Sequence, residues 1–175
     1  MVVRLRSNSI GSTRYCMGLV IAVLLLIAPT TFAETNPSYT LYPIATPEGE
    51  IFEASALEVL PDGRVAVALR KGEVWLVDGL YDNDPKTTTF KKIAEALHEP
   101  LNLLYKDEGL YVVQRGELTH LEDSDGDDII DVYRTVTSGW GITGNYHEYA
   151  YGAVPSKDGA LWITLNIGMG KANYP

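Results

Sequence analysis

Residues 121–131 carry carboxylates at nearly every second position, a pattern that can bind a hard metal ion. The four regularly spaced carboxylates are Asp123, Asp125, Asp127 and Asp131. Gly126 lies at the bend between them. Ca²⁺ accepts about six to eight oxygen ligands in a forgiving geometry, so these four side chains predict a calcium site. Arg134 stands where an EF-hand has its bidentate glutamate, which disfavours an EF-hand. The alternative is a solvated acidic hairpin tip.

Residues 138–149 form a loop rich in glycine and aromatic side chains, and His147 is its candidate catalytic group. A neutral imidazole there could take a proton from a substrate hydroxyl, with Glu148 or Glu99 orienting the ring. The alternative is a histidine packed against the aromatic side chains of the loop and bonded to a loop carbonyl. His98 has a similar place before a predicted strand, but His-Glu-Pro is also an ordinary turn at the start of a strand.

A strand, turn and strand pattern recurs three times and must position these groups. The predicted hairpins span residues 56–69, 101–114 and 151–165. Their turn glycines Gly63, Gly109 and Gly159 follow one another at about 46 and 50 residues, the period of a propeller blade. Third strands are predicted at 73–77 and 117–122, and outer strands at 90–94 and 131–136. His120 lies in one third strand, so we expect it at the surface or between blades.

The repeats predict an all-β fold, a partial β-propeller that spans residues 39–175. Unrelated hairpins in a β-sandwich are the alternative. A closed propeller needs about four to eight blades, and the pattern supplies about three. We therefore expect this chain to be the N-terminal portion of a longer protein, with further C-terminal blades as its partners. Residues 34–38 are a polar linker.

Blade geometry brings two sets of polar residues to one end of the blades, around the central channel. Connections into each inner strand and turns between the second and third strands open on that side. The first set is Glu53, His98, Glu99, Tyr146, His147 and Glu148, and the second is Arg70, Lys71, Arg115 and Asn166. Counted from the turn glycines, Glu53, Glu99 and Glu148 are expected to be equivalent. Such convergence is typical of a ligand site, although a single arginine there is more often a turn residue. We expect the acidic loop beside this mouth.

Residues 1–33 have the pattern of a secretory signal peptide. Three arginines precede an apolar run of about twelve residues, too short to span a bilayer, and Thr31-Phe32-Ala33 fits a cleavage site. We therefore expect a secreted or periplasmic protein with no membrane span after cleavage. The only cysteine, Cys16, would be removed with the leader, so no disulfide is available. The net charge of -9 argues against binding to nucleic acid.

Several of these motifs together resemble a known family. The segments that carry the resemblance are residues 60–64, 70–75, 97–101, 111–115, 121–131 and 139–148. They are similar to the propeller of secreted bacterial proteins related to glucose and sorbosone dehydrogenases. The branch in question is commonly labelled a membrane-bound dehydrogenase and often carries a haem-binding tail. No Cys-x-x-Cys-His motif occurs here, so covalent haem is not expected in this chain.

The resemblance implies a six-bladed, calcium-dependent enzyme that uses pyrroloquinoline quinone to oxidise a sugar or polyol. It implies His147 as the base. Arg70 and Arg115 would face the anionic quinone, and the further cofactor contacts would be His98, Glu99, Glu148 and Asn166. A chain with only part of the ring is not expected to be active alone. The alternative is a non-catalytic propeller that binds a carbohydrate or a protein, with Ca²⁺ in a structural role.

Overall fold

The computed structural model describes residues 2–7, 39–82, 84–142, 144–145 and 147–166. Within these residues the protein is almost entirely β, with one short 3₁₀ turn, η1 (Pro85–Thr87). No helix among them is long and apolar enough to cross a membrane. The predicted linker and most of the predicted signal peptide lie outside the described residues.

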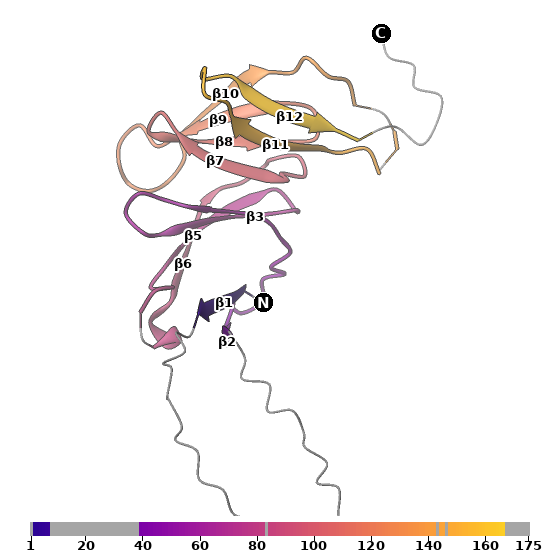
Figure 1. The fold of residues 1–175 in the computed structure, drawn as a ribbon. Coiled ribbons are helices and arrows are strands. Elements are labelled where there is room, and N and C mark those ends of the chain that lie inside the picture. The colour runs from indigo at the N-terminus through magenta and orange to yellow at the C-terminus, as the bar shows by residue number, and fades with distance from the viewer. Residues whose placement is uncertain (1, 8–38, 83, 143, 146, 167–175) are drawn as a thin grey trace, which may run out of the picture.

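Two four-stranded antiparallel sheets and a hairpin follow one another along the chain (Figure 1). Blade 1 consists of β3 (Ala54–Val59), β4 (Val65–Leu69), β5 (Glu73–Asp78) and β6 (Thr89–Ala94). Blade 2 consists of β7 (Asn102–Lys106), β8 (Gly109–Val113), β9 (Leu118–Glu122) and β10 (Val132–Thr137). The described part of blade 3 is β11 (Ala150–Pro155) and β12 (Leu161–Leu165). In blades 1 and 2 the spatial order of the strands is their sequence order, as in propeller blades. The prediction of a partial β-propeller is therefore confirmed.

The strands begin and end where the turn residues require it. Gly63 adopts a φ of 90°, and Asp62 accepts a hydrogen bond from the Arg64 amide at 2.9 Å, which closes the β3–β4 turn. Gly72 closes the β4–β5 turn with a φ of 107°. A Cβ atom on Gly72 would collide with the carbonyl oxygen of Leu97, so this position needs glycine for space as well as for conformation.

The core is made by the faces of the blades, because alternate residues of each strand point to opposite sides. One cluster lies on the face of blade 1 turned away from blade 2 and consists of Val65, Val67, Leu69, Trp75 and Val77. Two others lie between blades. One face of blade 1, including Ala66, Ala68 and Leu76, packs against Leu110 and Leu121 of blade 2. The other face of blade 2 packs on blade 3, where the contributing residues are Val113, Leu118, Ala150 and Ala153. The inner strands are neighbours, since β3 contacts β7 and β7 contacts β11. The blades are therefore stacked by apolar faces, and their connecting loops meet at the two ends of the strands.

A strand pair that the repeat did not predict precedes blade 1. Val2–Ser7 (β1) pairs antiparallel with Tyr39–Ile44 (β2), and Ile44 is buried. β1 falls within the segment that the sequence predicts to be a signal peptide. Cleavage after Ala33 would remove it, so β2 would lose this partner in a processed protein.

Candidate functional site: two polar clusters at opposite ends of the blades

One backbone hydrogen bond recurs in all three blades and defines equivalent positions at the mouth. The three pairs, each with a donor–acceptor distance of 3.0 Å, are Arg70 N to Glu53 O, Arg115 N to His98 O, and Asn166 N to Tyr149 O. The separation along the chain is the same in every pair. Arg70, Arg115 and Asn166 are therefore equivalent, as predicted. The positions opposite them are Glu53, His98 and Tyr149, so the predicted equivalence of Glu53 with Glu99 and Glu148 is wrong by one residue in the last two blades.

Glu99 joins the arginines of two successive blades. Its Oε2 lies 2.9 Å from Arg115 Nη1 and its Oε1 lies 3.2 Å from Arg70 Nη2. Arg70 Nη2 also donates to the Tyr149 hydroxyl at 3.2 Å. Tyr149 and, next, Glu99 raise the pKa of Arg70, so its guanidinium stays charged. We call Arg70, Glu99, Arg115 and Tyr149 the mouth cluster. Two cations around one carboxylate leave this cluster one positive charge.

The backbone of Glu99 is held in an unfavourable conformation. Its φ is 47°, in the left-handed region that a non-glycine residue rarely adopts, and it precedes Pro100, which disfavours helical conformations. The Pro100 carbonyl accepts a hydrogen bond from Ser55 Oγ at 2.5 Å, which ties this turn to β3 of blade 1. Local strain of this kind persists only where surrounding contacts impose it, and it concentrates at functional sites.

Arg115 is fixed from several sides. Its side chain is 12% exposed, whereas that of Arg70 is 49% exposed. Its Nη2 donates to the Asn145 carbonyl at 2.5 Å, and its carbonyl accepts from Trp140 Nε1 at 3.0 Å. The guanidinium carbon lies 5.7 Å from the centre of the Tyr149 ring. Arg115 Nε is buried without a hydrogen-bond partner among the described residues. Arg115 is thus a fixed group, and Arg70 is the arginine open to a ligand.

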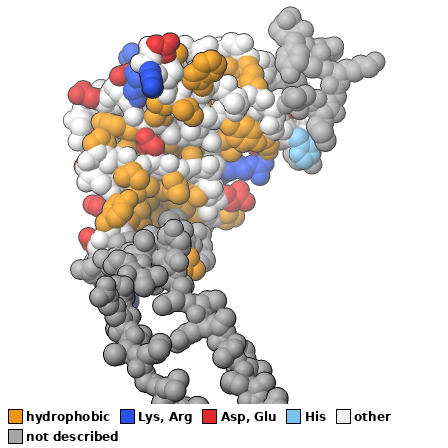
Figure 2. All heavy atoms as spheres, in the orientation of Figure 1, with side chains coloured by type: hydrophobic (Ala, Val, Ile, Leu, Met, Phe, Trp, Pro, Cys, Tyr) orange, Lys and Arg blue, Asp and Glu red, His pale blue; other side chains and the backbone are white. Residues whose placement is uncertain are grey.

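His147 lies at the same end of the blades, in an exposed position. Its amide donates to Asn145 Oδ1 at 3.1 Å, and its carbonyl accepts from Asn166 Nδ2 at 3.0 Å. Asn166 therefore holds the backbone of His147 against blade 3. Tyr146 lies outside the described residues. Figure 2 shows basic, acidic and histidine side chains together at the right-hand edge of the blades.

Two hollows adjoin the mouth cluster. A cavity of about 260 Å³ is lined by Arg115, Gly139, Trp140, Gly141, Ile142, Glu148, Tyr149, Ala150, Leu165 and Asn166. A more open hollow of about 270 Å³ is lined by Glu53, Arg70, Lys71, Leu97, His98 and Glu99. Of the residues predicted to bind a cofactor, Arg115, Glu148 and Asn166 share the first, whereas Arg70, His98 and Glu99 share the second. Glu99 and Arg115, which are hydrogen-bonded, link the two.

The acidic loop is organised by backbone amides. Asp123 Oδ1 accepts from Gly126 N at 2.8 Å and Asp127 N at 3.2 Å, and Asp123 Oδ2 accepts from Asp128 N at 2.8 Å. Desolvation acts to raise the pKa of Asp123, but these amides outweigh it and hold the pKa below its usual value. Asp131 Oδ2 accepts from the Ser124 hydroxyl at 2.9 Å. Asp123 and Asp131, two of the four predicted calcium ligands, therefore stabilise the loop through hydrogen bonds within it.

Three of those four carboxylates come together. Asp123, Asp125 and Asp131 each offer an oxygen, and these oxygens lie within 4.8 Å of one another. Asp127 is not part of this group, and its Oδ1 accepts a hydrogen bond from Ile129 N at 2.8 Å. Three hard oxygen donors fit part of a Ca²⁺ coordination shell, which backbone carbonyls and water can complete.

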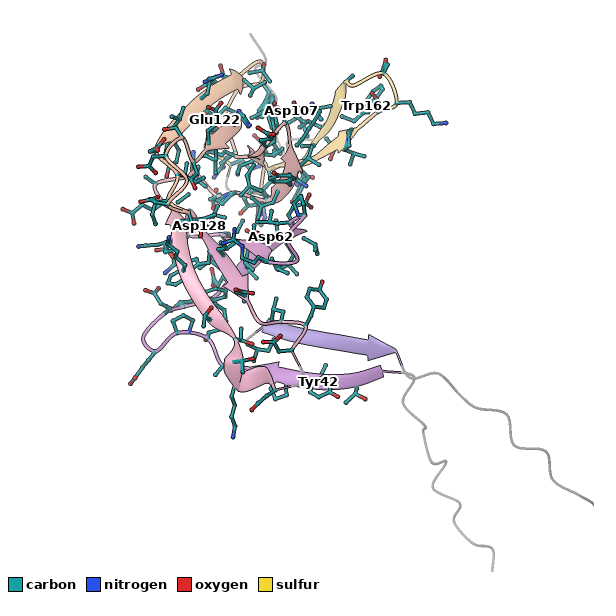
Figure 3. The ribbon with its side chains drawn as sticks, turned by 90° about the vertical axis from the view of Figure 1, so that its left-hand side faces the viewer. Tyr42, Asp62, Asp107, Glu122, Asp128 and Trp162 are labelled. Atoms are coloured by element: carbon teal, nitrogen blue, oxygen red, sulfur yellow. The ribbon has the colours of Figure 1, made fainter. Side chains whose placement is uncertain are left out.

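The loop is attached to blade 1 as well as to blade 2. Asp128 Oδ2 lies 2.9 Å from Arg64 Nη1, and this bond raises the pKa of Arg64. Ile130 N donates to the Ile93 carbonyl of β6 at 2.8 Å. Figure 3 shows Asp62 and Asp128 close together on the side of the blades that it faces. Arg64 belongs to the β3–β4 turn, at the end opposite the β4–β5 turn of the mouth. The expectation that the acidic loop lies beside the mouth is therefore wrong.

His120 is buried, with 8% of its surface exposed, so of the two placements expected for it the surface one is wrong. Its ring stacks on Tyr111 at a centroid distance of 4.4 Å, and its Nδ1 lies 2.9 Å from Glu122 Oε1. Gly109 makes room for it, because a Cβ atom there would collide with His120 Nε2. This histidine has a packing role on the face of blade 2 that meets blade 3.

Sequence reasoning missed Tyr149 and Trp140 as members of the site. Tyr149 stands at the same distance before Gly159 as Glu53 before Gly63, so an equal count from each glycine would have found it. Trp140 has no such signal, because it lies in an irregular loop. Its contact with the Arg115 carbonyl depends on the path of that loop.

The fold and these clusters define a partial β-propeller with a polar mouth, where arginines and carboxylates gather, and a separate acidic loop. A family model described as a domain of unknown function, DUF7133, matches residues 62–173, and the chain belongs to this family. The matched region runs from the β3–β4 turn beyond β12 and contains the mouth cluster and the acidic loop. No curated protein and no solved structure matches the chain.

Proposed function

We propose that this chain is part of a secreted or periplasmic, calcium-binding propeller that oxidises a sugar or polyol hydroxyl with a quinone cofactor. The observation that carries the proposal is the mouth cluster, where Glu99 holds two arginines from successive blades and one positive charge remains. That charge lies beside a cavity with Trp140 and Tyr149 in its wall. An anionic cofactor and an uncharged polyol are the ligands that such a site suits.

The proposed role of each mouth residue follows from how exposed its side chain is. Arg70, half exposed, is available to a carboxylate of the cofactor, while Arg115 is held by Glu99 and Asn145 and fixes the geometry. The exposed His147 takes the hydroxyl proton of the substrate. A bound quinone would supply the acceptor for the hydride that leaves the same carbon.

Calcium has a structural role in this proposal. Asp123, Asp125 and Asp131 would hold it at the end of the blades away from the mouth. The loop that contains them contacts blade 1 through Arg64 and Ile93, so the ion would stiffen the junction of the first two blades. Further blades are needed to close a ring around the mouth and to complete the site.

A second candidate is a non-catalytic carbohydrate-binding propeller. It is favoured by the cavity beside the cluster, which combines two aromatic rings with Glu148 and Asn166 but does not include His147 in its wall. Aromatic faces with a few polar groups suit a sugar ring, and a fold alone does not choose between catalysis and binding.

Reconstitution of the full-length protein, with its further blades, with pyrroloquinoline quinone and Ca²⁺, followed by a sugar and polyol screen, separates the two candidates. Oxidation favours the enzyme, and His147→Ala should then lower turnover by a factor of about 10² to 10⁴. Asn166→Ala is the matched variant that loosens His147 without removing the imidazole. Sugar binding by calorimetry without bleaching of the quinone would favour the second candidate. An unchanged rate in His147→Ala would remove this residue from the mechanism.

A further inference from the structure

A further cavity lies between blades 1 and 2, at the end of the blades away from the mouth. It has a volume of about 200 Å³, and side chains of both blades form its wall. Arg64 of the β3–β4 turn and Gly109 at the β7–β8 turn are among them. The lining includes no member of the mouth cluster. This cavity is therefore separate from the site of the proposed activity.

Most of the cavity wall is apolar. Its apolar side chains are those of Leu60, Leu76, Ile93, Leu110, Leu121 and Ile130. Four of them lie in the core between the blades and are at most 6% exposed, namely Leu76, Ile93, Leu110 and Leu121. An apolar cavity of about 150 Å³ can hold benzene, whereas drug-sized ligands need about 300 Å³ or more. A ligand with one aromatic ring or a short aliphatic chain therefore suits the size of this cavity.

The charged groups that complete the wall are mainly acidic. They are Arg64, Glu108, Asp123 and Asp128, one positive charge against three negative ones. Arg64 is already paired, because Asp62 lies 2.6 Å from its Nε and Asp128 lies 2.9 Å from its Nη1. Figure 3 shows these two partners side by side. The carboxylate of Asp123 accepts three backbone amides of its own loop. The charge around the cavity thus favours a cation and disfavours an anion.

Glu108 is the carboxylate left for a ligand. It is exposed, and its side chain makes no hydrogen bond or ion pair within the part of the chain that the structure describes. The turn that presents it has two residues between Lys106 and Gly109, whereas the corresponding turn of blade 1 has three between Leu60 and Arg64. The φ of Glu108 is 60°, a conformation that glycine would adopt at lower cost. The turn itself therefore does not require this side chain.

We propose that this cavity binds a small organic amine, with its apolar body between the blades and its ammonium group on the carboxylate of Glu108. A hydrogen bond from an ammonium group to an ionised carboxylate is roughly twice as strong as one between neutral groups. Tyr105 also lines the cavity, and an aromatic face attracts an ammonium group. A bound amine contacts both blades and so holds them together at the end opposite Glu99. The inference is independent of the proposed activity.

Calorimetry with phenethylammonium as the probe tests the proposal on the full-length protein. Excess Ca²⁺ is present throughout, because it competes with the probe for the acidic loop. We expect saturable binding with a dissociation constant at or below about 1 mM. Phenethyl alcohol has the same shape without the charge and should bind at least about tenfold more weakly, and phenylacetate should bind more weakly still. Equal affinities for the ammonium and the alcohol, or no saturation by about 10 mM ammonium, would overturn the proposal.

Two variants of the β7–β8 turn test the role of Glu108. Glu108→Gln should weaken the binding of phenethylammonium by about tenfold or more and leave that of phenethyl alcohol unchanged. Asp107→Asn is the matched control, because Asp107 belongs to the same turn and pairs with Lys106 but does not line the cavity. It should keep the affinity of the unaltered protein. Equal losses in the two variants would show that the overall charge of the turn, and not Glu108, attracts the probe. Both side chains are exposed, so both variants should fold.

Methyl spectra of protein labelled at isoleucine then locate the bound probe. Ile93 and Ile130 line this cavity, whereas Ile142 lines the cavity beside the mouth. We expect phenethylammonium to shift the signals of Ile93 and Ile130 and to leave that of Ile142 unchanged. A shift of Ile142 without the other two would place the probe at the mouth and contradict the proposal.

Discussion

Replacing Glu99 by glutamine tests whether this carboxylate holds blades 1 and 2 together at the mouth. The change keeps the size of the side chain and one carbonyl acceptor, but it removes the charge between Arg70 and Arg115. Unit charges 4 Å apart interact by about 4 kcal/mol at an effective dielectric constant near 20, and solvent reduces this further. Arg115, 12% exposed, should contribute more of the loss than Arg70, which is 49% exposed.

We expect Glu99→Gln to lower the free energy of unfolding by about 1 to 3 kcal/mol, between the values for surface and buried ion pairs. Urea denaturation followed by circular dichroism measures it, and the melting temperature should fall by roughly 2 to 8 °C per kcal/mol. Glu95→Gln is the matched control, because Glu95 is 66% exposed and pairs with Lys92 at the surface. If the two variants lost the same stability, the mouth cluster would not join the blades as we argue.

The remaining predictions concern the turns and the acidic loop. Gly72→Ala should destabilise the protein by more than about 2 kcal/mol in urea denaturation, because it combines a positive φ with a backbone collision, whereas Gly63→Ala has open space and should cost only about 1 kcal/mol. Equal losses would contradict this account. Ca²⁺ at about 100 times its dissociation constant should add about 2.7 kcal/mol of stability, and Asp125→Asn should abolish the gain while Asp127→Asn keeps most of it. The opposite ranking in thermal melts would refute the ligand set. The pKa of Asp123 is lower in the folded state than its ordinary value of 3.8. Its contribution to stability is therefore fully present at a pH above 3.8, and it is lost as the pH falls through the lower pKa of the folded state. Asp123→Asn should therefore flatten the acid limb of a stability-against-pH curve, and an unchanged limb would count against the amide contacts.

The sequence by itself determined the strands, the turns and the end of the blades where the polar residues gather. Alternating apolar residues and glycines with positive φ act within a few residues of the chain, so the hairpin around Gly63 could be found by inspection. The equivalence of Arg70, Arg115 and Asn166 followed from the same local count. For the opposite positions this count misses His98 by one residue, because Gly109 stands one residue later in its hairpin than Gly63 does. The count does find Tyr149, and the expectation of Glu148 departed from it by one residue.

Only the tertiary structure decided which polar groups meet. Glu99 reaches both arginines because a strained turn at Pro100 directs it between two blades, and no local pattern encodes that direction. Asp127 does not join the cluster of Asp123, Asp125 and Asp131, although its spacing in the sequence matches theirs. Its carboxylate instead accepts a hydrogen bond from the amide of Ile129 within the same loop. The acidic loop lies opposite the mouth because β9 runs away from it. Spacing along a strand fixes which face a residue lies on, whereas contacts between blades depend on how separate sheets pack.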